Sequence, residues 1–268
     1  MNVSSWLKAA AKKVDRLDAE LILSYVLSCE RTFLHAHPDY KLIDNEQKQA
    51  DHLLERRANH EPFAYLSGRK EFYGRIFAVT RDTLIPRPET EALIDAVKAL
   101  KPATILDVGT GSGCIAVTLA LELPDSTVEA VDISKGAIDI ARKNAERLGA
   151  NVNFYYSDLL QETGKYDLIV ANLPYVDRDW DWLSPELAFE PDSALYADDG
   201  GLEYIKQLIE QAKDHLTENG HLVLEADVSQ HQKISDYARD FQFDTISSAN
   251  GEAQNSALSM VLALHSEE

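Results

Sequence analysis

The sequence predicts an α/β protein whose doubly wound, mostly parallel sheet follows a small N-terminal helical domain, with a β-hairpin joining the two. Apolar residues recur at helical spacing from residue 3 to about 66. From residue 103 onward, short apolar runs alternate with longer amphipathic segments, as in a parallel sheet with crossover helices. The last two apolar runs, 243–247 and 258–264, have no helix between them, so one of these strands is expected to be antiparallel.

The first domain, residues 1–68, is expected to be helical and to recognise the substrate, because it carries no catalytic constellation. Short polar residues at the start of each apolar pattern are the candidate helix N-caps. They are Ser4 or Ser5 for the first helix and Asp18 for the second. Asp44 or Asn45 is expected to start a third helix, which runs to Asn59.

The second domain, residues 69–268, begins with two short strands around Gly74, which we interpret as a hairpin linker. Pro88 suits the first turn of a helix, and Glu89 and Glu91 suit its positive end. Strands are then expected at 104–108, 127–131, 152–156, 168–171, 221–225, 243–247 and 258–264. Helices are expected at 112–122, 135–148, 202–216 and near 230–240.

The charge of the chain disfavours nucleic acid as a partner. Among 268 residues, 26 Lys and Arg face 45 Asp and Glu, a formal charge of −19. Such a surface repels nucleic acid unless a basic patch overrides it, and the basic runs here are pairs such as Lys12-Lys13. We therefore expect no stable nucleic-acid binding and favour a protein or small-molecule substrate. The same charge also suits solubility alone.

Cysteine content and the lack of targeting signals point to a reduced compartment. Cys29 and Cys114 are the only cysteines, too few for a disulfide framework or a metal signature. The N-terminus lacks a basic region followed by an apolar core, and no apolar run approaches the roughly 20 residues of a membrane span. We expect a cytoplasmic protein without a membrane partner, and we expect a monomer.

A glycine loop, Gly109-Thr110-Gly111-Ser112-Gly113, follows an expected strand and opens an expected helix. Glycines let the backbone approach a ligand closely, and the N–H groups of the helix start face the same place. The loop therefore predicts a nucleotide-like cofactor. NAD, FAD and other nucleotide binders share such loops, and a tight turn without a ligand is the plainer alternative.

Asp132, Asp158 and Leu159, which follow the next two expected strands, refine this prediction. Asp132 ends a strand where a carboxylate can accept hydrogen bonds from both ribose hydroxyls, and it can also cap the following helix. Asp158 can accept from an adenine amino group while Leu159 packs on the ring. A solvated loop acid is the alternative for Asp158.

Asn172-Leu173-Pro174-Tyr175 are the most informative residues of the chain. The Asn172 oxygen can accept one N–H of a planar NH2 group and the Leu173 carbonyl the other, with the backbone of Leu173 restricted by the proline after it. Tyr175 can cover the flat face of the bound group. A strand-ending turn is the alternative. With the glycine loop upstream, we predict an S-adenosylmethionine-dependent N-methyltransferase acting on an amide or a base, with S-adenosylhomocysteine as product.

Over nearly its whole length, the chain resembles the PrmC/HemK family of peptide chain release factor glutamine methyltransferases. The strings that carry the resemblance are Pro62-Phe63-Ala64-Tyr65 with Gly68, Glu71-Phe72-Tyr73-Gly74, Leu84-Ile85-Pro86-Arg87-Pro88-Glu89-Thr90-Glu91, Asp107 to Gly113, Asn144-Ala145, Asn172 to Tyr175, and Phe189-Glu190-Pro191 with Ala194-Leu195. The string from Ile85 to Glu91 is far more specific than the glycine loop.

The resemblance implies the class I methyltransferase fold and methylation of N5, the side-chain amide nitrogen, of the Gln in the Gly-Gly-Gln motif of release factors. It implies that Gly109 to Gly113, Asp132, Leu159 and Asn172 hold S-adenosylmethionine. Asn172 to Tyr175 would hold the substrate glutamine, and Arg87 would contribute to substrate binding. Residues 1–68 would grip another part of the release factor.

The chain departs from the family pattern at three places. It has Leu173 where the family usually has Pro, Ala197-Asp198 where it tends to have Gly-Gly, and Glu225-Ala226-Asp227 where it tends to have Glu-Ile-Gly. Without that proline, Asn172 loses a backbone restriction. The departures bear on efficiency and substrate fit more than on the fold.

Three other functions stay open at the level of sequence. Asn-Leu-Pro-Tyr is also typical of enzymes that dimethylate adenines in ribosomal RNA, where an exocyclic amine would take the same place. The charge of −19 and the helical N-terminal domain count against N6-methylation of RNA. A catalytically weak relative that docks on release factors is a second alternative. A small-molecule methyltransferase is a third, and it leaves the helical domain unexplained.

Overall fold

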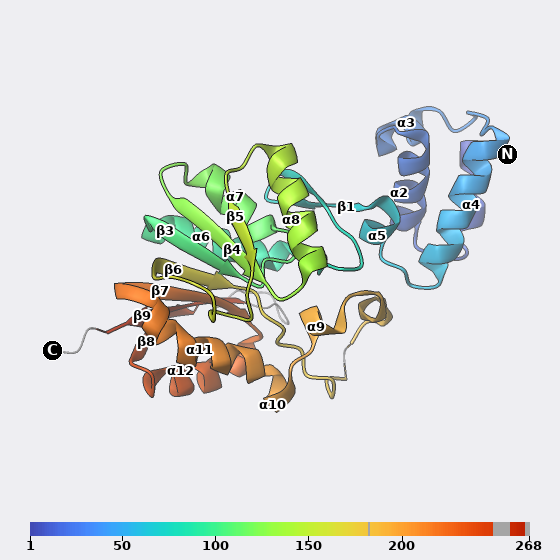
Figure 1. Ribbon diagram of the computed structural model, residues 1–268. Coiled ribbons are helices and arrows are strands. Elements are labelled where there is room, and N and C mark those ends of the chain that lie inside the picture. The colour runs from blue at the N-terminus through green and yellow to red at the C-terminus, as the bar shows by residue number, and fades with distance from the viewer. Residues whose placement is uncertain (182, 249–257, 266–268) are drawn as a thin grey trace. The chain divides into compact units, whose positions relative to one another are not determined.

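The computed structural model describes residues 1–181, 183–248 and 258–265. Its described residues form two compact units, whose elements are labelled in Figure 1. The first unit comprises Met1–Arg69 together with Ser184–Phe189. The second comprises Lys70–Leu183 and Glu190–Glu268, and it contains the large sheet.

The first unit is helical. Its helices are α1 (Val3–Ala10), α2 (Arg16–Leu27), α3 (Arg31–Ala36), α4 (Asp44–Ala58) and α5 (Phe63–Ser67). They enclose one apolar core, in which Trp6, Ile22 and Leu34 are almost completely buried. The 3-10 helix η2 (Pro185–Phe189) also belongs to this unit, and its Glu186 pairs with Arg57 of α4.

Two of the predicted helix caps in this unit are wrong. Asn2, not Ser4 or Ser5, caps α1, because its side chain accepts the N–H of Ser5. Asp15, not Asp18, caps α2 and accepts the N–H of Asp18. In both helices the cap is the residue with extended backbone directly before the first turn, and the predicted caps already lie inside that turn.

The second unit begins with a small sheet of two strands, β1 (Arg69–Phe72) and β2 (Arg75–Ala78), which confirms the hairpin around Gly74. The 3-10 helix η1 (Pro88–Thr90) then leads directly into α6 (Glu91–Leu100). Pro88 occupies the first turn of η1, as predicted, because a proline ring fixes the backbone dihedral that a helix start needs.

The large sheet is mostly parallel, and one of its last two strands along the chain is antiparallel to its neighbours, as predicted. Its strands are β3 (Thr104–Val108), β4 (Thr127–Asp132), β5 (Asn153–Tyr156), β6 (Tyr166–Ala171), β7 (Leu216–Ala226), β8 (Phe243–Ser248) and β9 (Leu258–Leu264). They lie in the order β5-β4-β3-β6-β7-β9-β8, and β9 runs antiparallel to β7 and β8. The predicted absence of a helix between β8 and β9 falls on residues outside the described ranges.

Helices cover both faces of this sheet (Figure 1). α6, α7 (Cys114–Glu122) and α8 (Lys135–Leu148) pack on one face, and α11 (Glu203–His215) and α12 (His231–Arg239) pack on the other. Because side chains alternate along a strand, Ile105 of β3 belongs to the apolar core beneath α6, α7 and α8, and Leu106 belongs to the core beneath α11 and α12. The central strands are therefore buried on both faces, and the polar side chains that could form a site lie at their ends.

Several short elements lie between the longer ones and were not predicted. They are α9 (Asp192–Leu195), α10 (Asp198–Gly201) and the 3-10 helix η3 (Val228–Gln230). β7 also begins at Leu216 rather than at 221, because Leu216 pairs with Tyr166 before a shift in register. None of the helices in the described ranges combines the length and apolar character that crossing a bilayer requires.

Candidate active site

A pocket of the second unit lies at the carboxyl ends of β3, β4 and β6. β3 pairs with β4 on one side and with β6 on the other, so the order of the strands reverses there. Open α/β sheets bind ligands in the crevice at such a switch of strand order. Of the predicted site residues, the pocket brings together Arg87, Gly109, Thr110, Gly111, Ser112, Asp132, Asp158, Leu159, Asn172, Leu173 and Pro174.

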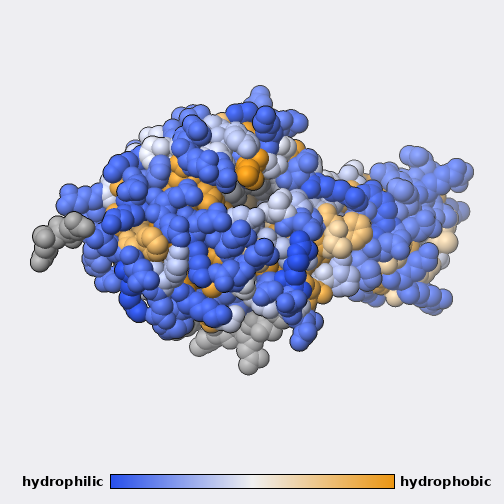
Figure 2. All heavy atoms as spheres, turned by 60° about the horizontal axis from the view of Figure 1, so that its bottom comes forward, coloured by the Kyte–Doolittle hydropathy of each residue, from blue (hydrophilic) through white to orange (hydrophobic). Residues whose placement is uncertain are grey.

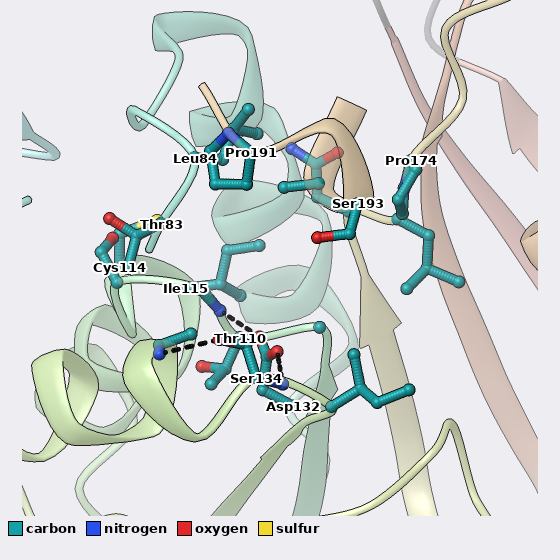
Figure 3. A pocket seen from close by; sticks show the side chains of 18 of the residues that line it. Thr83, Leu84, Thr110, Cys114, Ile115, Asp132, Ser134, Pro174, Pro191 and Ser193 are labelled. Carbon is teal, nitrogen blue, oxygen red and sulfur yellow. Dashed lines mark hydrogen bonds between the residues drawn. The ribbon is translucent and has the colours of Figure 1, made fainter. Parts of the chain in front are cut away.

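Two further segments complete the walls of the pocket. Leu84 comes from the segment before η1, Pro191 precedes α9, and Ser193 lies in its first turn. Figure 3 shows Leu84 and Pro191 at one end of the pocket and Asp132 at the other. The sequence strings from Leu84 to Glu91 and from Phe189 to Pro191 therefore contribute to one cavity.

Asp132 is held in place by the glycine loop. Its Oδ2 accepts the N–H of Gly111 and its Oδ1 accepts the N–H of Ser134, both at 2.8 Å. Burial raises the pKa of Asp132, while the hydrogen bonds from these amides lower it. Each carboxylate oxygen keeps a further lone pair, so the fixed carboxylate can still accept from hydroxyl groups of a ligand.

Asp107 is fully buried at the end of β3. Its Oδ2 accepts from the Thr110 hydroxyl at 2.7 Å and from the N–H of Ala116 at 3.2 Å, whereas Oδ1 has no hydrogen-bond partner among the described residues. Burial raises the pKa of Asp107 to about 7, against the lowering effect of those two bonds. An unpartnered acceptor beneath the loop suits a cationic or N–H group of a ligand.

Gly113 does not line the pocket. Its φ is +79°, it forms the N-cap of α7, and an added Cβ would lie 3.0 Å from Cβ of Ala141 in α8. The glycine therefore allows α7 and α8 to pack closely and places the loop amides correctly. Direct contact between Gly113 and a cofactor stays a prediction.

Asp158 and Leu159 follow β5 and line the same pocket. Leu159 is buried and has a φ of +48°, a left-handed backbone that a leucine rarely adopts. Asp158 is exposed and accepts a long hydrogen bond of 3.4 Å from Gln161. The pair offers an apolar surface next to a carboxylate, as an adenine ring with its amino group requires.

Asn172 ends β6 with a defined side-chain orientation. Its Nδ2 donates to Oγ1 of Thr90 in η1 at 3.0 Å. Oδ1 is therefore the atom that Asn172 can offer to a ligand, as an acceptor of an N–H. Leu173 is buried beside it, and both residues line the pocket with Pro174.

Tyr175 lies outside the pocket lining. Its hydroxyl donates to Oε1 of Glu225 at 3.2 Å, and its carbonyl accepts from Nε2 of Gln230 at 2.9 Å. A Cβ on Gly201 would lie 2.0 Å from that carbonyl oxygen, so the backbone of α10 passes directly against Tyr175. These contacts fix the loop after Asn172, and the stacking role expected for Tyr175 stays a prediction.

Arg87 lines the pocket next to a buried partner. Its guanidinium pairs with Oε1 of Glu190, whose side chain is 1% exposed, and Oε2 of Glu190 accepts the N–H of Ile85 at 2.9 Å. Glu190 thereby holds the segment from Ile85 to Arg87 against the pocket. The sequence reasoning gave Thr90, Glu190 and Glu225 no role of their own, although each lies in a string that it singled out.

Two family models match the chain. The PrmC N-terminal domain matches residues 2–68, and the methyltransferase small domain matches residues 88–182.

Curated relatives match over most of their length. The release factor glutamine methyltransferase of Koribacter versatilis (strain Ellin345) is 44% identical, covering 88% of this chain and 87% of that protein. The protein of the same name from Neisseria gonorrhoeae (strain ATCC 700825 / FA 1090) is 42% identical, covering 84% of each. The one from Escherichia coli (strain K12) is 38% identical, covering 84% of this chain and 86% of that protein.

Solved structures agree with the fold. A methyltransferase from Pyrococcus furiosus has a TM-score of 0.57 at 18% identity, covering 82% of this chain and 98% of that one. A ribosomal protein L11 methylase from Lactobacillus delbrueckii subsp. bulgaricus has a TM-score of 0.51 at 24% identity, covering 67% of this chain and 81% of that one. At these identities the likeness concerns the fold alone.

Proposed function

The chain belongs to the family of release factor glutamine methyltransferases, and we propose that it methylates the glutamine of the Gly-Gly-Gln motif in peptide chain release factors. The methyl group passes from S-adenosylmethionine to N5, the side-chain amide nitrogen, and S-adenosylhomocysteine is the second product. The observation that carries the proposal is the orientation of Asn172, whose Nδ2 is committed to Thr90 so that its oxygen is available to an N–H donor beside the glycine loop.

The cofactor half of the pocket fits a nucleoside with a charged tail. S-adenosylmethionine supplies a methyl group on a sulfonium, which is a good leaving group. Asp132 offers acceptors for the ribose hydroxyls, and Asp158 with Leu159 offers the surface for adenine. Asp107 is buried beneath the glycine loop and does not line the pocket, so its unpartnered Oδ1 is proposed to reach the ammonium of the methionine tail through water.

The substrate half of the pocket fits a primary amide. A glutamine side chain donates two N–H bonds from one nitrogen, and Asn172 Oδ1 with the carbonyl of Leu173 provides two acceptors for them. Arg87, held by Glu190, lies at the same pocket and contributes to binding of the protein substrate.

Positioning must carry much of the rate, because an amide nitrogen is a poor nucleophile with a delocalised lone pair. Holding two reactants in line recovers roughly 7–11 kcal/mol of barrier. Accepting both N–H bonds aims the nitrogen at the methyl group and increases electron density on it. No base needs to act before the transfer, since the proton can leave the nitrogen afterwards.

The helical unit, residues 1–68, is proposed to grip a part of the release factor away from its glutamine. Its match to the PrmC N-terminal domain and its lack of pocket residues support this role. The proposed substrate is a cytoplasmic protein, so the reaction would take place in the cytoplasm.

The test is transfer of a labelled methyl group from S-adenosylmethionine to three acceptors in parallel. They are purified release factor, its Gly-Gly-Ala variant and ribosomal RNA, because an adenine amino group also presents two N–H bonds. Label on the Gly-Gly-Gln protein alone is the expected result. Label on RNA would move the assignment to adenine methylation. No label on any acceptor, with the cofactor still bound, would point to a docking protein without turnover.

A further inference from the structure

Glu225 is a buried carboxylic acid that the proposed methyl transfer leaves without a task. It lies near the end of β7 and is 2% exposed. Its Oε1 accepts from the Tyr175 hydroxyl, whereas Oε2 has no hydrogen-bond partner among the described residues. A buried oxygen without a partner destabilises the folded state, so its presence beside the site requires a reason.

Thr90 lines the pocket beside Asn172 and lies near Glu225. Its Oγ1 accepts the N–H of Asn172, and its side chain is buried. The Thr90 hydroxyl and the Asn172 amide both lie close enough to Glu225 to lower the pKa of its carboxyl. A threonine hydroxyl has one proton to donate and lone pairs with which to accept. The neighbour that takes this proton therefore determines whether Thr90 faces its other neighbour as an acceptor or as a donor.

We propose that Glu225, Thr90 and Asn172 form a hydrogen-bond relay in which Glu225, as the carboxylate, sets which end of the Asn172 side chain faces the substrate. The inference deepens the proposed amide methylation and rests on it. In this relay the Thr90 hydroxyl gives its proton to Oε2 of Glu225, the oxygen without another partner, which leaves only lone pairs on Oγ1 toward Asn172. Asn172 must then donate its Nδ2 to Thr90, and its Oδ1 faces the pocket as an acceptor. Glu225 and Thr90 are thus positioning residues.

Protonation of Glu225 reverses the relay. The neutral acid can donate to Thr90, and Thr90 can then donate to Oδ1 of Asn172. Asn172 would present N–H groups to the N–H groups of the substrate, and the two would repel. Burial raises the pKa of Glu225 to about 7, against the lowering effect of Thr90, Tyr175 and Asn172. The reversal therefore falls within a pH range in which the enzyme can be assayed.

The neighbouring charges do not remove this titration. Glu89 of η1 raises the pKa of Glu225, and the thiol of Cys114 in α7 also lies within its field. Arg87 and Asp227 act with opposite sign on the Tyr175 hydroxyl, which is the hydrogen-bond partner of Glu225.

The relay is tested by the pH dependence of kcat/KM for release factor methylation at saturating S-adenosylmethionine. The variants are Glu225→Gln, Thr90→Val, their double variant and Thr90→Ser, which keeps the hydroxyl. Glu129→Gln is the matched control, because Glu129 also accepts from tyrosine hydroxyls, those of Tyr155 and Tyr166, without contacting Asn172. Calorimetric affinity for S-adenosylmethionine checks that each variant is folded.

The expected wild-type profile falls on the acid side with an apparent pKa near 7. Glu225→Gln and Thr90→Val should each lower kcat/KM at high pH by roughly 10- to 100-fold, by analogy with the loss of a group that orients a metal ligand. Both variants should lose the acid limb, and the double variant should lose no more than either single one. Thr90→Ser and Glu129→Gln should keep the limb. An acid limb that persists in Thr90→Val, or additive losses, would overturn the relay.

A second readout does not depend on any acceptor. In protein labelled with 15N at asparagine, the Asn172 side-chain amide signal should shift with the titration of Glu225, and Thr90→Val should reduce that shift to the smaller direct effect of the nearby carboxylate. An Asn172 signal that does not respond to pH would also overturn the relay. If the signal titrates while no release factor is methylated, the relay stands and the proposed function fails.

Discussion

At the scale of single residues, the direction of one amide group decides what the pocket can bind. Asn172 donates through Nδ2 to Thr90, which leaves its oxygen for the N–H group of the proposed substrate. A primary amide or an exocyclic amine satisfies that oxygen with an N–H, whereas a carboxylate nucleophile has no proton to give. On the proposed function, the chemistry of the methyl acceptor follows from this hydrogen bond within the protein.

Replacing Asn172 removes this acceptor. For Asn172→Ala we expect the barrier to methyl transfer to rise by about 2.7–4 kcal/mol, as when one preorganised polar contact is lost. Affinity for S-adenosylmethionine should fall less, since the glycine loop and Asp132 remain. Single-turnover methylation and calorimetry measure the two quantities. Turnover close to that of wild type would contradict the assigned role.

Sequence reasoning found the local motifs of the site and gave no role to the residues that support them. Asn172 and Asp132 were singled out because each follows an apolar run beside a recognisable pattern. Thr90, Glu225 and Glu190 act on partners that are 82, 50 and 103 positions away along the chain. Only the tertiary fold brings such residues together, so no local spacing could indicate their contacts.

At the scale of elements, the segment from β6 to α11 closes the pocket from one side. Glu190 in this segment binds the N–H of Ile85 and the guanidinium of Arg87. Pro191 and Ser193 follow it into the pocket lining. A short irregular stretch is therefore held in one conformation by a buried carboxylate.

Glu190→Gln tests that element. The variant keeps an oxygen for the N–H of Ile85 but loses the charge that faces Arg87, so we expect the free energy of unfolding to fall by about 1.5–3 kcal/mol, the worth of a hydrogen bond to a charged group. Chemical denaturation measures the change. Asp236→Asn is the control, because it breaks an exposed pair with Arg239 and should change stability by less than about 0.5 kcal/mol. Equal effects of the two substitutions would refute the stabilising role of Glu190.

Elements with a clear period and clear ends were predicted well. α8 agrees at both ends, because Ser134 caps its start and Gly149 ends it in the left-handed conformation. α9 and α10 were missed, since four residues each are too few to display a helical period. The early start of β7 was missed because Leu216 also continues the apolar pattern of α11.

At the scale of the whole molecule, the negative charge is unevenly distributed along the chain. Residues 1–69 contain 10 Lys and Arg and 10 Asp and Glu, so the entire excess of acid lies in residues 70–268. Figure 2 shows a face that is hydrophilic over most of its area, with hydrophobic residues scattered across it. A methyltransferase unit of this charge repels an RNA backbone, which agrees with a protein substrate.

The buried carboxyl of Asp107 makes stability depend on pH. Its folded-state pKa is about 7, above the ordinary value of 3.8, so the folded state binds its proton more tightly than the unfolded state does. Stability from this group is therefore present at low pH and is lost as pH rises toward 7. The free energy of unfolding of Asp107→Asn without cofactor, measured relative to that of wild type, should therefore rise by on the order of 2–3 kcal/mol as the pH increases from about 5 to about 8. Chemical denaturation at both pH values measures this difference, and a difference that does not change with pH would contradict the account.

The most direct test of the central claim is to locate the methyl group. Release factor treated with the enzyme and S-adenosylmethionine would be digested and sequenced by tandem mass spectrometry. We predict a single methyl group on the side-chain nitrogen of the glutamine in Gly-Gly-Gln. A methyl group on any other residue, with that glutamine unmodified, would contradict the account.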